Sequence, residues 1–108
     1  MLDGVWLATF FGPGGSQGSV VTLRKGVLTG ATTFCEYTGA YTAEHGSFKG
    51  RITIRSVLSF ATDNFAGVAG KFTVEVSGHV EDDRRIEAFG CLQNNNAAIQ
   101  MVLAKLPL

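Results

Sequence analysis

The residues of this sequence that could carry out chemistry are few, and their spacing matches no common catalytic or metal site. The histidines are His45 and His79, and the cysteines are Cys35 and Cys91. A zinc site needs three or four ligands at set spacings, and neither histidine has a cysteine or a second histidine nearby in the sequence. Nucleophilic catalysis needs a base beside the nucleophile, and no local motif of that kind is present. We therefore expect a protein that is not an enzyme and that uses no metal or other cofactor.

A glycine-rich stretch at residues 12–18 invites comparison with a phosphate-binding loop. Such a loop ends in lysine followed by serine or threonine, and it leads into a helix whose first N–H groups hold the phosphate. Here the stretch leads into Ser19, Val20 and Val21, which is strand-forming sequence. We interpret residues 12–18 as a flexible hairpin loop. We expect the two cysteines to be reduced and buried as small apolar residues.

The elements that would position these residues are strands. Apolar and polar residues alternate with period two along most of the chain, which is the pattern of a strand with one face in a core. Polar turns separate the alternating segments, and the acidic run Glu81-Asp82-Asp83 is predicted to be one of these turns. The predicted strands are residues 4–11, 19–24, 27–29, 33–42, 48–56, 72–77, 84–93 and 97–106. No helix of ordinary length is predicted.

The strands and the composition together favour one architecture. A chain of 108 residues that is 45% hydrophobic, with 14 glycines and 2 prolines, suits a single domain of short strands and tight turns. A closed barrel removes the exposed edges that two open sheets would leave. We therefore predict an all-β fold over residues 1–108, a single antiparallel eight-stranded up-and-down β-barrel.

The inward-facing residues decide what such a barrel could hold. At about eight strands, the interior is either filled by side chains or holds one small ligand. Large apolar side chains can fill the interior or form the floor of a pocket. The predicted lining is Trp6, Phe10, Phe48, Ile52, Ile54, Phe72, Val74 and Val76. A carrier or sensor of a small apolar ligand is one functional hypothesis.

The first and last predicted strands are apolar on both faces, which is unusual for an antiparallel sheet with one side in water. These strands are neighbours in a closed barrel, so their outward residues would form a patch larger than a monomer normally exposes. The patch comprises Val5, Leu7, Phe11, Val102, Ala104 and Leu106. We predict a homodimer interface there. The alternative is that the irregular segment 56–70 covers the patch.

The charges exclude several classes of partner. Nine basic and nine acidic residues cancel. A general nucleic-acid binder needs a basic surplus, and so does adhesion to an anionic membrane. The chain begins without the positive region of a signal peptide, and no apolar run is long enough to span a membrane. We therefore expect a cytoplasmic protein that binds neither nucleic acid directly nor a membrane.

Several short motifs, taken in order along the chain, carry a family resemblance. They are Asp3-Gly4-Val5-Trp6, the glycine-rich stretch, Val21-Thr22-Leu23-Arg24-Lys25-Gly26, Thr29-Gly30, Tyr37-Thr38-Gly39-Ala40-Tyr41, Val76-Ser77-Gly78 and Leu103-Ala104-Lys105-Leu106. Their order and spacing resemble GrlR-like proteins, the negative regulators of type III secretion and their bacterial relatives, over nearly all 108 residues. The resemblance implies a lipocalin-like β-barrel that dimerises. In the regulator itself, a loop of alternating acidic residues binds a helix-turn-helix transcriptional activator.

The loop of this sequence that matches the acidic loop by position is residues 43–46. It keeps a single acid, Glu44, followed by His45, and these two residues are the predicted partner contact. The acids of Glu81-Asp82-Asp83 lie on a different hairpin, so we interpret them as a solvated turn. The leading hypothesis is a non-enzymatic regulatory module that acts through its outer surface on a protein such as a transcriptional activator. A third hypothesis is a structural domain whose neighbours in its own pathway supply the function.

Overall fold

The computed structural model describes residues 2–58, 64–93 and 96–107, and these form strands and turns. The strands are β1 (Gly4–Gly12), β2 (Gly15–Arg24), β3 (Val27–Ala31), β4 (Cys35–Glu44), β5 (Ser47–Ser56), β6 (Lys71–Asp82), β7 (Arg85–Leu92) and β8 (Ala98–Lys105). Each predicted strand corresponds to one observed strand. The described residues include no helix long and apolar enough to cross a membrane.

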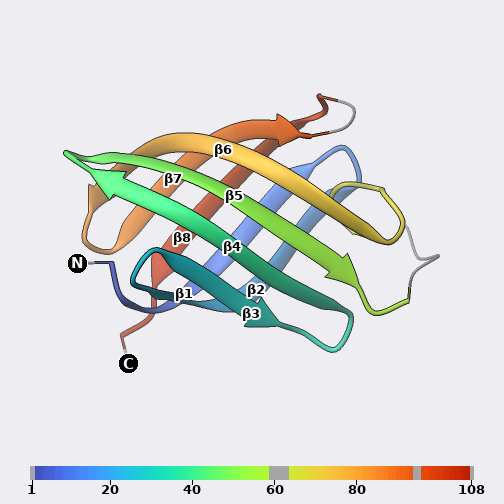
Figure 1. Ribbon diagram of the computed structural model, residues 1–108, viewed down its shortest axis with the longest axis horizontal. Coiled ribbons are helices and arrows are strands. Elements are labelled where there is room, and N and C mark those ends of the chain that lie inside the picture. The colour runs from blue at the N-terminus through green and yellow to red at the C-terminus, as the bar shows by residue number, and fades with distance from the viewer. Residues whose placement is uncertain (1, 59–63, 94–95, 108) are drawn as a thin grey trace.

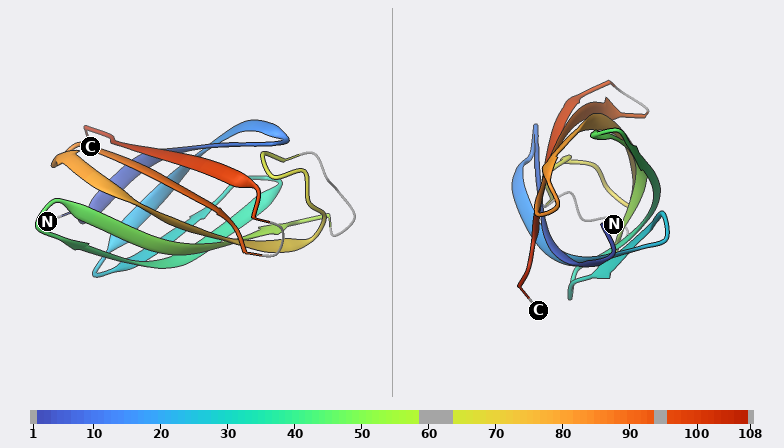
Figure 2. Two further views of the ribbon diagram at one scale, coloured as in Figure 1. Left: turned by 90° about the horizontal axis from the view of Figure 1, so that it is seen from above. Right: turned by 90° about the vertical axis from the view of Figure 1, so that its left-hand side faces the viewer.

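The strands form a closed antiparallel barrel in which every strand pairs with its neighbours in the sequence (Figure 1). The barrel closes because β8 also pairs with β1, in a register that places Ala104 opposite Leu7 and Val102 opposite Thr9. Figure 2 shows the strands wrapping around one central interior. The prediction of an eight-stranded up-and-down barrel is confirmed.

The two ends of the barrel differ. One end, which we call the mouth end, carries the β1–β2 turn, the β3–β4 connection and residues 64–70 (right in Figure 1). The opposite end, which we call the base end, carries the β2–β3, β4–β5 and β6–β7 turns together with both chain ends (left in Figure 1). The two ends therefore present different sets of turns to solvent.

The period-two alternation places one face of each strand inside the barrel. In β5, Phe48, Ile52 and Ile54 are buried, while Lys49 and Arg51 are exposed. Continuous apolar packing of the inward residues supplies the driving force for closure, since burying each large apolar side chain contributes roughly 1.5–3 kcal/mol. The barrel interior is therefore the hydrophobic core of the protein.

Two inward-facing glycines let the strands curl tightly enough to close the barrel. A Cβ at Gly90 of β7 would overlap the carbonyl oxygen of Glu75 on β6, and a Cβ at Gly78 of β6 would overlap the carbonyl oxygen of Glu87 on β7. Glycine in a strand commonly marks such a bend or a close approach of another backbone. These positions admit no side chain unless the two strands separate.

Two predicted turns are shorter in the structure than expected. The glycine-rich stretch is not a flexible loop, because β1 continues to Gly12, β2 begins at Gly15, and the two pair up to these ends. Glu81 and Asp82 belong to β6 rather than to a turn. Their acidic side chains are compatible with a strand because they are exposed, and Glu81 pairs with Arg85 of β7 at 3.1 Å. Asn94 and Asn95, which follow β7 in the sequence, lie outside the described residues.

Candidate functional site

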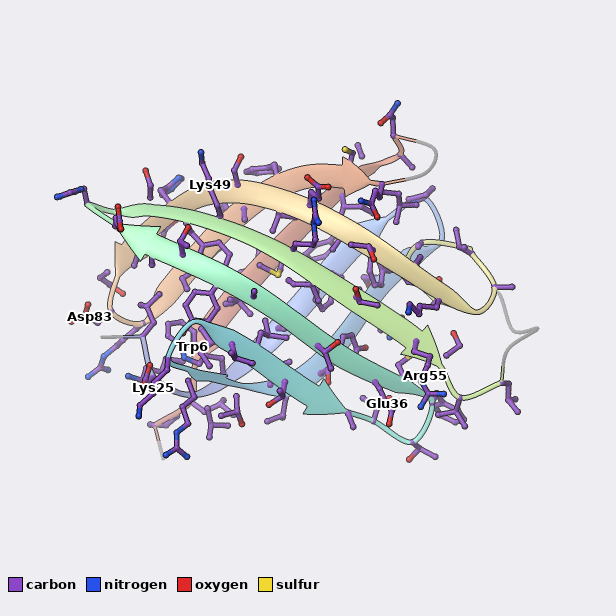
Figure 3. The ribbon with its side chains drawn as sticks, viewed as in Figure 1. Trp6, Lys25, Glu36, Lys49, Arg55 and Asp83 are labelled. Carbon is purple, nitrogen blue, oxygen red and sulfur yellow. The ribbon has the colours of Figure 1, made fainter. Side chains whose placement is uncertain are left out.

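The predicted lining residues all lie inside the barrel. Each of the eight is at most 4% exposed, and they belong to one continuous core. They are Trp6, Phe10, Phe48, Ile52, Ile54, Phe72, Val74 and Val76. Trp6 lies toward the base end (Figure 3), where its Nε1 donates a hydrogen bond to the Leu2 carbonyl at 2.8 Å.

Aromatic rings pack against one another inside the barrel toward the mouth end. Phe65, from the segment between β5 and β6, is fully buried, and its ring stacks on Phe10 with ring centroids 4.8 Å apart. The Phe65 and Phe72 rings pack edge to face with their centroids 5.5 Å apart, and the Tyr37 ring stacks on the Phe10 ring with a centroid distance of 5.7 Å. The predicted lining residues are therefore packed against other side chains of the core. Phe65 was not in the predicted lining because its segment has no strand periodicity.

A polar cluster accompanies these rings. The side-chain amide of Gln17 donates to the Tyr37 hydroxyl and, at 3.4 Å, to the Cys35 Sγ, and its carbonyl oxygen accepts from the Phe65 N–H at 3.2 Å. Burial raises the pKa of the Tyr37 hydroxyl above its ordinary value. Gln17 thus joins β2, β4 and the segment that carries Phe65. Tyr37 belongs to the predicted strand 33–42, but the partners of its hydroxyl depend on pairing between distant segments.

The predicted dimer residues lie on the outer wall where β1 meets β8. Leu7 is 41% exposed and Phe11 is 40% exposed. The other four, Val5, Val102, Ala104 and Leu106, are partly exposed. The Leu106 N–H donates to the Val5 carbonyl at 2.9 Å, so the chain end continues the contact between the two strands. The structure brings all six residues together on one wall.

Two further apolar residues extend this wall. Val20 of β2 is 52% exposed and lies opposite Leu7, and Phe89 of β7 is 52% exposed and shares a cross-strand row with Gln100 and Phe11. We call Leu7, Phe11, Val20, Phe89, Val102 and Ala104 the outer patch. Alternation alone places Val20 and Phe89 on the outside, but only the strand order shows that they are neighbours of Leu7 and Phe11.

The segment 56–70 is the alternative cover for the predicted dimer residues. Its described part lies at the mouth end, where the Gly14 N–H donates to the Phe65 carbonyl at 2.7 Å and the Phe65 side chain enters the core. Leu7 and Phe11 keep their exposure with this segment in place. The segment's residues 59–63 lie outside the described part of the chain.

The predicted partner residues lie at the base end. Glu44 ends β4, and His45 follows in the tight turn with a φ of 53°. A hollow of about 560 Å³ opens beside them. It is lined by Leu2, Asp3, Lys25, Gly26, Tyr41, Ala43, Glu44, His45, Gly46, Val80, Asp82 and Asp83. The barrel thus brings the β6–β7 turn next to the β4–β5 turn, although the two are far apart in the sequence; Lys25 and Asp83 mark this end in Figure 3.

A second hollow, which we call the mouth pocket, opens at the other end, with a volume of about 530 Å³. Its lining contains no charged residue. The residues are Gly14, Ser16, Gln17, Gly18, Thr32, Phe34, Cys35, Ser56, Leu58 and Asn64. None of the eight predicted lining residues belongs to this set. The pocket therefore lies above the packed core rather than within it.

The groups considered for chemistry remain apart. Among the described residues, no three His, Cys, Asp or Glu side chains come close enough together to hold a metal ion. Cys35 and Cys91 are free thiols; Cys35 is buried as predicted, whereas Cys91 is partly exposed because it faces the outside of β7. On the outer wall of β5, Arg51 pairs with Glu75 at 3.0 Å and Arg55 pairs with Glu36, as Figure 3 shows for the second pair. The basic residues of this strand are thus largely engaged in cross-strand ion pairs.

Comparisons with known proteins bear on the fold alone. No protein-family model matches the chain, and no curated protein matches it. A solved structure described as a redesigned beta barrel is similar, with a TM-score of 0.51 and 11% sequence identity, over 97% of this chain and 91% of that one. At this identity, the likeness shows that the chain has a β-barrel fold.

Proposed function

We propose that this barrel is a non-enzymatic protein-binding module of the cytoplasm, a regulator of the GrlR-like, lipocalin-like type that works as a homodimer. The observation that carries the proposal is the outer patch, in which four large apolar side chains between 40% and 52% exposed lie on β1, β2 and β7. The partly exposed Val102 and Ala104 of β8 lie between β7 and β1. Contiguous apolar surface of this kind marks protein interaction sites. Completing the burial of each such side chain contributes on the order of 1 kcal/mol.

The base end suits the partner that the family resemblance implies. Glu44 stands alone in its turn, but Asp3, Asp82 and Asp83 line the same hollow, with Lys25 as the basic residue among them. An acidic hollow of this kind attracts a basic protein surface such as the DNA-contacting face of a transcriptional activator. The acids that the family gathers in one loop would here come from several turns. This arrangement supports a regulatory partner at the base end.

The packed interior favours the binding module over the carrier of a small apolar ligand. A ligand inside the barrel would have to displace stacked rings such as Phe10 and Phe65, whose centroids are 4.8 Å apart. Interiors packed in this way resist changes in volume. A small ligand would instead find space in the mouth pocket, which is the observation that keeps the carrier as the second candidate.

Replacing Leu7 by glutamate tests the dimer. Leu7 is 41% exposed, so the barrel tolerates the change, whereas a carboxylate in the centre of an apolar interface is left without a partner. We expect a dimer of the unaltered protein in sedimentation at micromolar concentration and a monomer for Leu7→Glu, with the same circular dichroism spectrum. Val102→Glu should act in the same way.

The matched control is Val27→Glu on β3, where the side chain is 49% exposed but lies outside the outer patch. This variant should remain a dimer. An unaltered protein that sediments as a monomer at high micromolar concentration would rule out the interface.

A further inference from the structure

The barrel wall is incomplete on one side of the mouth end. β3 has 5 residues, whereas its neighbours β2 and β4 have 10 each. β2 pairs with β3 only from Val21 to Arg24, and among the described residues its first part, from Gly15 to Val20, pairs with β1 alone. The edge of β2 over residues 15–20 therefore faces the place where a longer β3 would lie.

The pairing pattern identifies the main-chain groups on this edge. In an antiparallel pair, successive residues direct their N–H and C=O groups alternately to one neighbouring strand and to the other. Arg24 and Val27 close the two-residue β2–β3 hairpin, so every second residue counted back from Arg24 faces the β3 side. Ser16 and Gly18 are in this phase. Their N–H and C=O groups point to the free edge, whereas those of Gln17 and Ser19 point to β1.

The mouth pocket lies beside this edge. Ser16 and Gly18 form one side of its lining, and Phe34 and Leu58, which are 71% and 51% exposed, contribute apolar rims. Its lining carries no charge, and an ionised group placed there would lose hydration without gaining a partner. The pocket volume of about 530 Å³ accommodates an uncharged side chain with its backbone.

We propose that the mouth end binds an extended, uncharged polypeptide segment of a partner protein, which adds a strand to the free edge of β2. The segment runs antiparallel to β2, hydrogen-bonds to the main chain of Ser16 and Gly18, and places one apolar side chain in the mouth pocket. In strand addition, main-chain hydrogen bonds give affinity and a pocket for an alternate side chain gives specificity. The inference goes beyond the proposed function, since it uses neither the outer patch nor the acidic base end.

A peptide fits this edge better than a small molecule does. The edge offers N–H and C=O groups in alternation, which is the pattern that another backbone completes. Natural barrels and sheets usually protect a free edge with lysine, proline or a bulge, and residues 15–19 include no charged residue and no proline. A Cβ at Gly18 would have the Ala8 carbonyl oxygen as its nearest heavy atom at 3.8 Å, so the outer face of the sheet is uncrowded at this residue.

The test begins with a displayed library of capped, uncharged nonapeptides, panned against the full chain. A synthetic copy of a selected peptide is then titrated against two variants of one position. Gly18→Ala keeps the N–H group, and its methyl group has space. Gly18→Pro removes this N–H at an edge position where proline is tolerated. We expect binding by Gly18→Ala within about threefold of the unaltered protein, and a loss of at least about tenfold for Gly18→Pro.

Amide hydrogen exchange of the unaltered protein supplies a second measurement that needs no variant. The peptide should slow exchange at Ser16 and Gly18 and leave Gln17 and Ser19, which already bond to β1, unchanged. If Gly18→Pro fails to fold, Phe34→Glu replaces it, since this side chain is 71% exposed and a carboxylate there should weaken binding as strongly.

Several results would overturn the inference: a library that yields no binder, a peptide that binds Gly18→Pro as well as Gly18→Ala, or protection that does not alternate along residues 16–19. Leu7→Glu should bind the peptide normally. If the unaltered protein is a dimer but binds no peptide, strand addition is rejected and the proposed function is unaffected. If the unaltered protein binds the peptide but is a monomer, only the dimer is rejected.

Discussion

At the scale of single residues, Tyr37 shows how a polar group is accommodated in an apolar interior. Its ring stacks on Phe10 at 5.7 Å, and its hydroxyl accepts a hydrogen bond from Gln17. A buried hydroxyl without a partner would cost about 1–3 kcal/mol. The hydrogen bond from Gln17 removes this cost, and it links the mouth end of β2 to β4.

This environment predicts how stability responds to alkaline pH. Burial raises the pKa of Tyr37 above its ordinary value of 10.0, so the folded state holds the hydroxyl proton more tightly than the unfolded chain does. The protonated Tyr37 hydroxyl therefore contributes fully to the free energy of unfolding below pH 10. This contribution is lost as the pH rises through the pKa of Tyr37 in the folded state. We expect the free energy of unfolding, measured in urea, to fall from pH 10 upward.

The variant Tyr37→Phe isolates this contribution. It should lower the free energy of unfolding by about 1–2 kcal/mol at neutral pH, because Gln17 loses its acceptor. It should also make the decline above pH 10 shallower, although not flat, since burial raises the pKa of Tyr41 as well. An equally steep decline in the variant would mean that other groups control the alkaline transition.

At the scale of elements, strand curvature depends on close contact between β6 and β7. Gly90 and Gly78 face inward at positions where a side chain would meet the backbone of the opposite strand. Because the overlapping atoms are main-chain atoms rather than a movable side chain, the strands must separate to admit a methyl group. The closed barrel therefore depends on glycine at these positions.

We expect Gly90→Ala to lower the free energy of unfolding by at least about 2 kcal/mol. Gly18→Ala is the matched control, since its nearest heavy atom would be 3.8 Å away, and it should change stability by no more than about 0.5 kcal/mol. Urea unfolding of both variants measures the difference. Equal stability of the two variants would show that β6 and β7 can move apart without cost.

At the scale of the whole molecule, the barrel distributes different surfaces over its wall and its ends. The outer patch lies on the wall formed by β1, β2, β7 and β8, the acidic hollow lies at the base end, and the mouth pocket lies at the opposite end. This separation allows a dimer to form through the wall while both ends stay accessible. A regulator that joins partners needs this kind of arrangement.

The proposed dimer would make the stability of the protein depend on its concentration. A protein that is stabilised by self-association melts at a higher temperature when its concentration rises. We expect the melting temperature of the unaltered protein to rise by about 2–4 °C for each tenfold increase in concentration. The melting temperature of Leu7→Glu should not depend on concentration. A melting temperature of the unaltered protein that is independent of concentration would argue against the dimer.

The alternation of apolar and polar residues predicts the strands, their order along the chain and which residues face the interior. These properties follow from local alternation, because a strand directs successive side chains to opposite faces whatever its neighbours are. The eight predicted lining residues are buried for this reason. Alternation also placed Leu7 and Phe11 on the outside. The prediction of a flexible loop at residues 12–18 was wrong, because strand pairing extends into glycine-rich sequence that has little strand preference of its own.

Contacts between segments that are distant in the sequence follow from the three-dimensional fold alone. Phe65 enters the core from a segment without periodicity, and Asp82 of β6 lines the same hollow as Glu44 of β4, with β5 between the two strands. The free edge at Ser16 and Gly18 depends on β3 being shorter than β2, which is a property of pairing rather than of either strand alone. Contacts of this kind are set by strand register and barrel closure, and no local pattern in the sequence records them.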